Sequence, residues 1–219
     1  MRTVAVLPVK SFGRAKQRLE AAVGRPERAG LAAAMLGDVL AALGAVPGLD
    51  GVIVVTAEPR AAEAGRAAGA LVIGDPAEAG QSAAAVLGIE AALARKAERV
   101  LLVPGDCPAL DPGEVAGLLD GFPAADVLIV PDRHGQGTNA LRLAPPGVLA
   151  PAFGPGSFAR HAARAAAAGA SVRVAPAPSL ELDVDTPDDL VALRAALAAL
   201  PDAAPRTRAA LARLLPAAA

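Results

Sequence analysis

The chain has 219 residues, of which 20% are charged and 54% are hydrophobic, so it is too apolar for a disordered protein and fits one α/β domain. A net charge of −1 and an aromatic content of four Phe argue against a nucleic-acid-binding protein, because such proteins need surplus cations and stacking rings. A single cysteine excludes a disulfide framework, and no apolar run approaches the ~18 residues of a membrane span. We therefore expect a cytoplasmic protein without a membrane partner.

Short apolar runs alternate along the chain with longer helical patterns. The predicted strands cover residues 4–9, 51–56, 71–73, 100–103, 127–130, 139–143 and 172–174. The predicted helices cover about 26–43, 60–68, 82–96, 112–119, 158–168 and 187–200. This alternation predicts an α/β fold, a three-layer αβα sandwich with a mostly parallel, Rossmann-like sheet.

The segment at about 131–157 breaks this rhythm, because it is rich in Gly and Pro and has few helix signals. We expect an inserted strand here that runs antiparallel to the rest of the sheet. The prediction is a single domain over residues 1–201, followed by an Ala-rich tail at 202–219 with the pattern of a short helix.

Ligands of such a sheet bind at the carboxyl ends of its strands, so the loops there are the candidate sites. The loop after the first strand holds four cations, Lys10, Arg14, Lys16 and Arg18. Paired cations and loop amides are suited to a polyphosphate, and the alternative is a solvated basic loop. Neither GxGxxG nor GxxxxGK[ST] is present, which excludes a dinucleotide fingerprint and a P-loop.

Acidic residues follow two later strands. Asp106 lies in a rigid turn between Gly105 and Cys107, where a carboxylate suits Mg²⁺, although it could merely close the turn. Asp183 and Asp185 point to one side of an extended segment and repel each other unless a cation lies between them.

Other polar residues near these loops have structural interpretations. Asp111 is the predicted N-cap of the helix that follows it, and Thr186 and Asp189 come close to a capping box. Cys107 is interpreted as a small buried hydrophobic residue.

Two glycine-containing stretches precede predicted helices. Ser157 is the predicted N-cap of the helix from 158, where free N–H groups favour a phosphate or carboxylate, and an ordinary cap is the alternative. His161, one turn into this helix, is expected either to face the bound phosphate or carboxylate or to have a purely structural role. Gly80 and Ser82 approach a nucleobase through backbone groups, or Ser82 is a helix cap.

Together these loops resemble the nucleotidyltransferase superfamily with a glycosyltransferase-A type, nucleotide-diphospho-sugar transferase-like fold. Within it the chain is similar to the 2-phospho-L-lactate/phosphoenolpyruvate guanylyltransferases of coenzyme F-420 biosynthesis. The resemblance runs from Thr3 to about Leu200 and lies in the stretches PVKSFGRAKQRL, VPGDCPAL, GTNAL, FGPGSFARH and LDVDTPDDL.

The resemblance implies a role for each candidate residue. Lys16 and Asp106 would be catalytic, and Asp106, Asp183 and Asp185 would hold Mg²⁺, with Asp183 favoured over Asp185. The residues implied in nucleotide binding are Lys10, Arg14, Lys16, Arg18, Gly80 and Ser82, and those implied in acceptor binding are Thr138, Gly154 and Ser157. Relatives often have Asn at the position of Ser82.

The implied reaction transfers GMP from GTP to a phosphorylated three-carbon acid, and the product passes to a deazaflavin-accepting transferase. Phosphoenolpyruvate is the expected acceptor, because the Ala and Arg content resembles the bacterial members that use it. The alternatives are 2-phospho-L-lactate, 3-phospho-D-glycerate, a molybdopterin or sugar phosphate, or a non-catalytic nucleotide-binding regulatory subunit. The sequence does not fix the oligomeric state, and a homodimer stays open.

Overall fold

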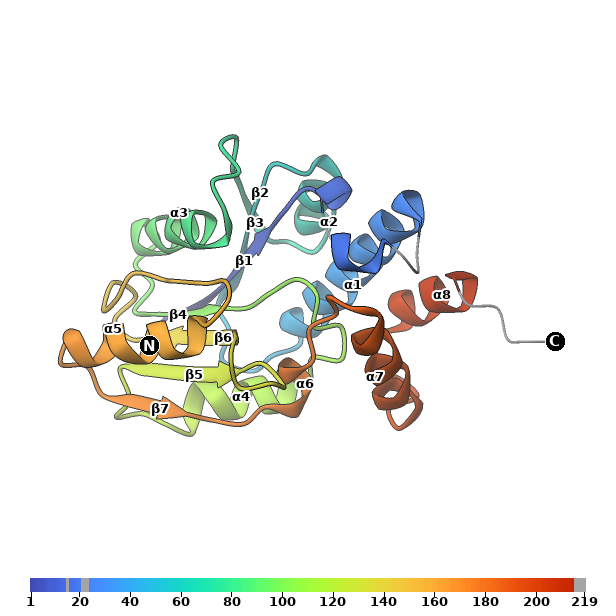
Figure 1. The fold of residues 1–219 in the computed structure, drawn as a ribbon. Helices are drawn as coiled ribbons and strands as arrows, with labels where there is room; N and C mark the ends of the chain where they lie inside the picture. The colour runs from blue at the N-terminus through green and yellow to red at the C-terminus, as the bar shows by residue number, and fades with distance from the viewer. Residues whose placement is uncertain (15, 21–23, 215–219) are drawn as a thin grey trace.

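A seven-stranded sheet lies between two helical layers in the computed structural model, which describes residues 1–14, 16–20 and 24–214 (Figure 1). The strands are β1 (Thr3–Val9), β2 (Gly51–Thr56), β3 (Leu71–Gly74), β4 (Arg99–Leu102), β5 (Val127–Pro131), β6 (Thr138–Leu143) and β7 (Val172–Val174). Their order across the sheet is β3-β2-β1-β4-β6-β5-β7. All the predicted strands are present, which confirms the α/β fold.

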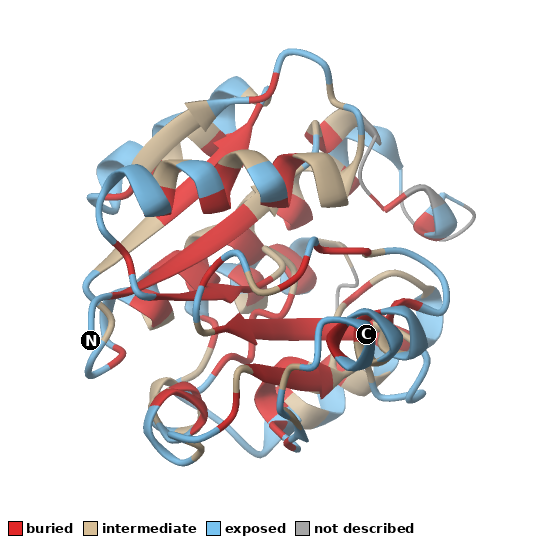
Figure 2. Cartoon of the chain, turned by 90° about the vertical axis from the view of Figure 1, so that its left-hand side faces the viewer, coloured by how far each residue is buried: buried red, intermediate tan, exposed pale blue. Residues whose placement is uncertain are grey.

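The central strands are buried along almost their whole length, as Figure 2 shows in red. β1 pairs in parallel with both β2 and β4, and β2 pairs in parallel with β3. Strands of a parallel sheet are covered by helices on both faces, and this explains why these runs are continuously apolar in the sequence.

One strand runs against the others. β6 pairs antiparallel with β4 and with β5, which confirms the inserted antiparallel strand, while β5 and β7 are parallel. Because β6 is reversed, its first residue, Thr138, lies at the edge of the sheet where β1 and β4 end. The insertion therefore adds side chains to the carboxyl edge.

The helices are α1 (Arg25–Gly44), α2 (Pro59–Ala67), α3 (Gln81–Ala94), α4 (Pro112–Asp120), α5 (Ser157–Ala167), α6 (Pro178–Glu181), α7 (Pro187–Ala198) and α8 (Pro205–Leu214), with 3₁₀ turns η1 (Phe12–Arg14) and η2 (Gln17–Leu19). One core packs α1, α2, α4 and α6 on the sheet, and a second packs α3 and α5 on the opposite face. The sequence did not predict α6.

A buried arginine joins the inserted strand to the helical layer. The guanidinium of Arg142 on β6 donates to carbonyl oxygens at the end of α4, those of Leu118 and Leu119 at 3.2 Å and those of Phe122 and Ala125 at 2.8 and 2.9 Å. The last carbonyls of a helix have no partner within the helix, and a cation there also compensates the negative end of the helix dipole. Arg142 therefore fixes α4 against β6.

The C-terminal helix α8 docks on α1. The carboxylate of Asp38 on α1 is buried and accepts the N–H groups of Arg206 at 3.2 Å and Thr207 at 2.7 Å. It supplies the cap that the first turn of α8 needs. A third apolar cluster, with Met35 and Leu211 among its members, fills the space between α1, α7 and α8.

Within residues 1–14, 16–20 and 24–214, no helix is both long and apolar enough to cross a lipid bilayer.

Candidate functional site

A cavity of about 720 Å³ opens at the carboxyl edge of the sheet. It is walled by the loops after β1, β3 and β4, the start of β6, the loop before α5 and the segment before α7. The candidate residues that line it are Lys10, Lys16, Arg18, Gly80, Asp106, Thr138, Gly154, Ser157, Asp183 and Asp185. The side chain of Arg14 lies outside the part of the chain that the structure describes, and Ser82 is not among the lining residues.

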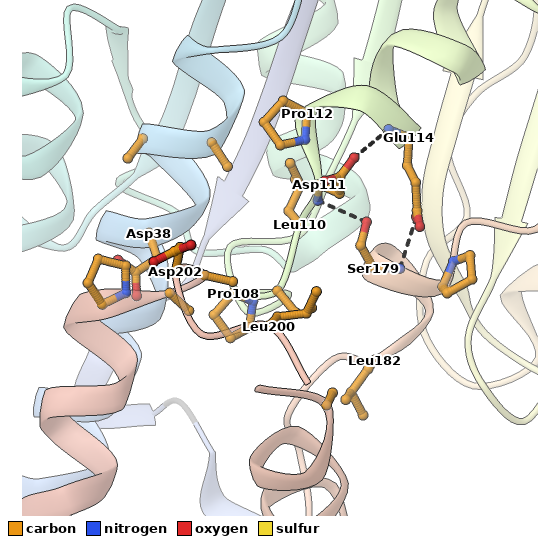
Figure 3. A pocket seen from close by; sticks show the side chains of 18 of the residues that line it. Asp38, Pro108, Leu110, Asp111, Pro112, Glu114, Ser179, Leu182, Leu200 and Asp202 are labelled. Atoms are coloured by element: carbon orange, nitrogen blue, oxygen red, sulfur yellow. Dashed lines mark hydrogen bonds between the residues drawn. The ribbon is translucent and has the colours of Figure 1, made fainter. Parts of the chain in front are cut away.

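A second cavity, of about 630 Å³, lies between α1, α4, α6 and the turn before α8 (Figure 3). Its polar groups hold these elements together. Asp111 caps α4 by accepting the N–H of Glu114 at 2.8 Å, as predicted, and its own N–H donates to the Ser179 hydroxyl at 3.0 Å. The Glu114 carboxylate accepts the N–H of Ser179 at 3.0 Å. The larger, more charged cavity is therefore the candidate site.

The basic loop after β1 is anchored by acidic side chains of the neighbouring loops. The N–H of Ser11 donates to Glu78 at 3.2 Å, and the N–H of Phe12 donates to Glu58 at 2.9 Å. The Phe12 ring is buried in the core beneath. These contacts fix the path of the loop that carries the cations.

Lys16 points into the cavity while Lys10 and Arg18 stay exposed at its rim. The ammonium of Lys16 lies between two carboxylates, in contact with Asp106 and 2.9 Å from Asp185, and its side chain is only 5% exposed. Burial alone would lower the pKa of Lys16, but the charges of Asp106 and Asp185 outweigh it and raise this pKa above its usual range. Lys16 is therefore a permanent cation.

Asp183 lies beside Asp106 because the main chain holds the two segments together. The N–H of Val184 donates to the Asp106 carbonyl at 3.3 Å. Burial, together with the nearby charge of Asp106, raises the pKa of the Asp183 carboxyl to about 6, against the opposing hydrogen bond from Asn139. The site thus holds a carboxylate whose charge is poorly compensated.

Asn139 is a site residue that the sequence reasoning missed. It is buried on β6, and its amide donates to Asp183 at 3.1 Å and to the carbonyl of Leu180 at 2.9 Å. The signal was a polar residue inside an apolar strand, which is costly unless it is hydrogen-bonded. Asn139 fixes the orientation of Asp183.

The carboxylates do not form a ready-made metal cluster. Among the described residues, no three His, Cys, Asp or Glu side chains group closely enough to hold a metal ion. The Oδ1 atom of Asp106 is nonetheless buried without a hydrogen-bond partner in the described chain. Lys16 supplies the positive charge at this point.

Cys107 is a buried residue of the same turn, and its thiol donates to the carbonyl of Leu180 at 3.3 Å. Burial, reinforced by Asp106 and Asp183, raises the pKa of the thiol well above its usual value. The interpretation of Cys107 as a small buried residue is confirmed.

Two predicted helix caps are wrong. Ser157 is the first residue of α5, and Gly156 with φ 70° is the N-cap. The N–H groups of Ser157 and Phe158 donate to the carbonyls of Gly154 at 3.0 Å and Gln136 at 3.1 Å, so the helix start is partly closed by its own loop.

Ser82 is likewise the second residue of α3, and Gly80 with φ 111° is the N-cap. A positive φ is easy only for glycine, and it sets the helix start one or two residues earlier than the serine predicts. The Ser82 hydroxyl accepts the N–H of Phe153 at 2.9 Å and so supports the loop before α5. The capping box of Thr186 and Asp189 on α7 is present as predicted.

His161 lies behind Thr138 and is completely buried. Its Nε2 accepts the N–H of Ala152 at 2.8 Å, and its Nδ1 lies 2.9 Å from the Thr138 hydroxyl. Burial, together with the charges of Arg164 and Arg160, lowers the pKa of His161 to about 4. Both ring nitrogens are engaged within the chain, which confirms the structural interpretation.

The carboxyl-edge cavity belongs to an α/β fold that this chain shares with solved transferase structures. A structure assigned to the nucleotide-diphospho-sugar transferases, from Desulfovibrio desulfuricans G20, matches with a TM-score of 0.78 at 18% identity and covers 97% of this chain and 95% of its own. A nucleotidyl transferase from Methanothermobacter matches with a TM-score of 0.65 at 19% identity, over 91% of this chain and 99% of its own.

The family follows from the sequence. The family model described as guanylyl transferase CofC like matches residues 3–195, and the chain belongs to this family. The phosphoenolpyruvate guanylyltransferase of Conexibacter woesei is 48% identical over 217 residues, which are 98% of this chain and 97% of that protein. The resemblance seen in the motifs is confirmed.

Proposed function

We propose that this chain transfers GMP from GTP to phosphoenolpyruvate and releases diphosphate, in the biosynthesis of coenzyme F-420. The product would be enolpyruvyl-2-diphospho-5′-guanosine, a substrate for a deazaflavin-accepting transferase. The observation that carries the proposal is one cavity that joins cations from the loop after β1 to the carboxylates of Asp106, Asp183 and Asp185, in a chain of the CofC-like family. The guanylyltransferase named above, 48% identical over nearly the whole chain, supports the acceptor.

The nucleotide end of the cavity is the cationic loop. Lys10 and Arg18 at the rim and Lys16 inside would bind the triphosphate, with Lys16 nearest the reacting phosphate. Gly80 lies on the same wall and offers no side chain to obstruct a base. Charge-assisted hydrogen bonds to phosphate are about twice as strong as neutral ones, which suits a loop rich in Lys and Arg.

The three carboxylates fit a hard divalent cation. Asp106, Asp183 and Asp185 offer oxygen donors, and the buried Oδ1 of Asp106 has no partner in the described chain. Mg²⁺ prefers such donors and keeps several waters, so it needs few protein ligands. When bound it would neutralise charge on the triphosphate and on the departing diphosphate.

The chemistry needs alignment more than proton transfer. A phosphate oxygen of the acceptor attacks the α-phosphorus of GTP, a new P–O bond forms, and the bond to the diphosphate oxygen breaks. The attacking oxygen is already ionised at neutral pH, so no general base is required. Lys16 and the rim cations reduce repulsion between the two anions and hold them in line.

Thr138, Gly154 and Ser157 line the same cavity as the basic loop and would bind the acceptor. Thr138 comes from the reversed strand β6, and the other two come from the loop before α5. An acceptor bound by these residues would share one cavity with the nucleotide.

The test is diphosphate release with Mg²⁺, in which each nucleoside triphosphate is paired with phosphoenolpyruvate, 2-phospho-L-lactate and 3-phospho-D-glycerate. We expect turnover with GTP and phosphoenolpyruvate. Turnover with another of these acids would correct the acceptor alone. No turnover with GTP and any of them would overturn the proposal and favour a molybdopterin or sugar phosphate enzyme, or a regulatory subunit.

Replacement of one carboxylate tests the site. Asp106→Asn removes a charge that the metal and Lys16 share, and we expect turnover to fall by about 10³-fold or more, a typical loss for a group that stabilises charge in the transition state. Circular dichroism should show an unchanged fold. Asp188→Asn is the matched control, because Asp188 is exposed on α7 outside the cavity and should keep full activity. Unimpaired diphosphate release by Asp106→Asn would refute the role of this carboxylate.

A further inference from the structure

The two hydrogen bonds of the His161 ring fix which of its nitrogens accepts and which donates. A backbone N–H can only donate, so the bond from Ala152 at 2.8 Å requires an unprotonated Nε2. A neutral ring then carries its proton on Nδ1, which donates to the Thr138 hydroxyl at 2.9 Å. The oxygen of Thr138 is thereby an acceptor, and its own proton must point elsewhere.

We propose that His161 is a positioning residue that turns the hydroxyl proton of Thr138 into the cavity, toward an anionic oxygen of the acceptor acid. Thr138 lines the cavity while His161 is fully buried behind it, so the ring acts only through the hydroxyl. The identity of the acid rests on the function proposed above. The direction of the hydroxyl rests on the hydrogen bonds alone.

The surroundings of His161 keep the ring neutral and fixed. Arg160 and Arg164 on the same helix disfavour a second proton, and the pKa of about 4 leaves the ring neutral at physiological pH. The rings of Phe153 and His161 pack edge to face, with centroids 5.1 Å apart and an interplanar angle of 75°. The ring therefore has little freedom to flip and exchange its two nitrogens.

The two arginines also brace the loop in which Ala152 lies. Arg160 donates to the carbonyl of Ala152 at 2.9 Å, and Arg164 donates to those of Ala150 at 2.7 Å and Pro151 at 3.1 Å. The loop thus has supports that do not involve His161. Loss of the imidazole should leave the loop in place and affect the hydroxyl.

The direction of this hydroxyl would select the charge of the ligand. A hydroxyl that must donate favours a carboxylate or phosphate oxygen and disfavours a group that can only donate. A hydrogen bond to a charged group contributes enough to change affinity by roughly 10- to 100-fold. The effect should fall on the acceptor, since the cations proposed to bind GTP belong to a different segment, the loop after β1.

The first experiment measures the tautomer without any substrate. In long-range ¹H–¹⁵N spectra of the ¹⁵N-histidine-labelled protein at pH 7.5, we expect the signals of a neutral ring protonated at Nδ1. The protein has only two histidines, so the signals absent from a His161→Gln sample identify the ring. A proton on Nε2, or a charged ring, would overturn the proposal whatever the enzyme's substrate proves to be.

The second experiment separates the two contacts of the ring. His161→Gln can still accept from Ala152 but lacks the donor at Nδ1, whereas His161→Asn places an amide near Nδ1 and loses the contact with Ala152. We expect His161→Gln to raise KM for phosphoenolpyruvate about tenfold, with KM for GTP unchanged, and His161→Asn to stay within about threefold of the parent.

A double-mutant cycle with Thr138→Val completes the test. If His161 acts through the hydroxyl, His161→Gln has no further effect on KM in the Thr138→Val background. Independent, multiplying effects, or a greater loss in His161→Asn than in His161→Gln, would show that the ring merely supports the loop. If the parent enzyme uses another of the three acids, the same measurements apply to that acid.

Discussion

At the scale of single residues, Asp183 lies where burial and the neighbouring Asp106 both oppose its charge. A carboxyl whose pKa is raised from 3.8 to about 6 on folding penalises the native state at every pH at which the unfolded chain is already ionised. The penalty grows as pH rises from about 4 to about 6 and is complete above that range.

We therefore expect Asp183→Asn to raise the free energy of unfolding of the metal-free protein by about 1–2 kcal/mol at pH 7.5. Denaturant titrations at several pH values measure this, and the gain should vanish near pH 4, where the native carboxyl is also protonated. The same variant should lose diphosphate release. If Asp183→Asn stabilised the protein equally at pH 4 and pH 7.5, the charge of the Asp183 carboxylate could not be the cause.

Lys16 and Asp106 could be predicted for the candidate site because they follow the strands β1 and β4, and the carboxyl edge collects the loops of strands far apart in sequence. The contacts among the site residues could not. Asn139 and Asp183 are 44 positions apart, and Thr138 and His161 are 23 apart, so each pairing exists only through tertiary packing. The sequence predicts that Lys16 binds a phosphate. It does not predict the contact of Lys16 with Asp185, which lies 169 positions further along the chain.

At the scale of elements, β6 and α4 are joined by the guanidinium of Arg142, which is 1% exposed. Arg142→Met fills similar space but removes the guanidinium donor from the buried carbonyls of Leu118 and Ala125. We expect the free energy of unfolding to fall by about 2–4 kcal/mol, since unsatisfied buried polar groups are among the largest sources of destabilisation.

Equilibrium denaturation measures this loss. Arg194→Met is the control, because Arg194 is exposed on α7 and its replacement should change stability by no more than about 0.5 kcal/mol. Equal effects of the two substitutions would show that Arg142 contributes nothing beyond an ordinary surface arginine.

The strands were the most predictable elements, because continuous apolar runs between Gly and Pro leave few alternatives in a chain of this composition. The helix α6 was missed for a physical reason. It spans four residues, Pro178–Glu181, which is too short to show helical periodicity, and the contacts of Ser179 with Asp111 and Glu114 hold it in place.

At the scale of the whole molecule, α8 extends the core beyond the sheet through its contact with α1. Asp38→Ala removes the acceptor for two N–H groups at the start of α8, a loss of about 1–2 kcal/mol for a helix cap. Hydrogen exchange should accelerate in α8 while the amides of β1 stay protected. Asp202→Ala, at an exposed position before α8, is the control and should leave exchange unchanged. Uniform acceleration across the molecule would contradict a local docking role.

The order of the strands across the sheet could not be predicted from the sequence. Period and composition distinguish a buried strand from a helix, but they do not state that β6 lies between β4 and β5. That position depends on which apolar faces fit together, and it is what brings Thr138 to the same edge as Asp106.

The ammonium of Lys16 between Asp106 and Asp185 makes the resting site carry its own counter-ion. The positive charge of Lys16 would repel a divalent metal that arrived alone, and the carboxylates would repel a triphosphate without metal. If the two arrived together, the triphosphate would attract the ammonium, and the carboxylates would be available to the metal. In thermodynamic terms, we expect GTP and Mg²⁺ to be positively coupled ligands of this protein, each strengthening the binding of the other by the same factor.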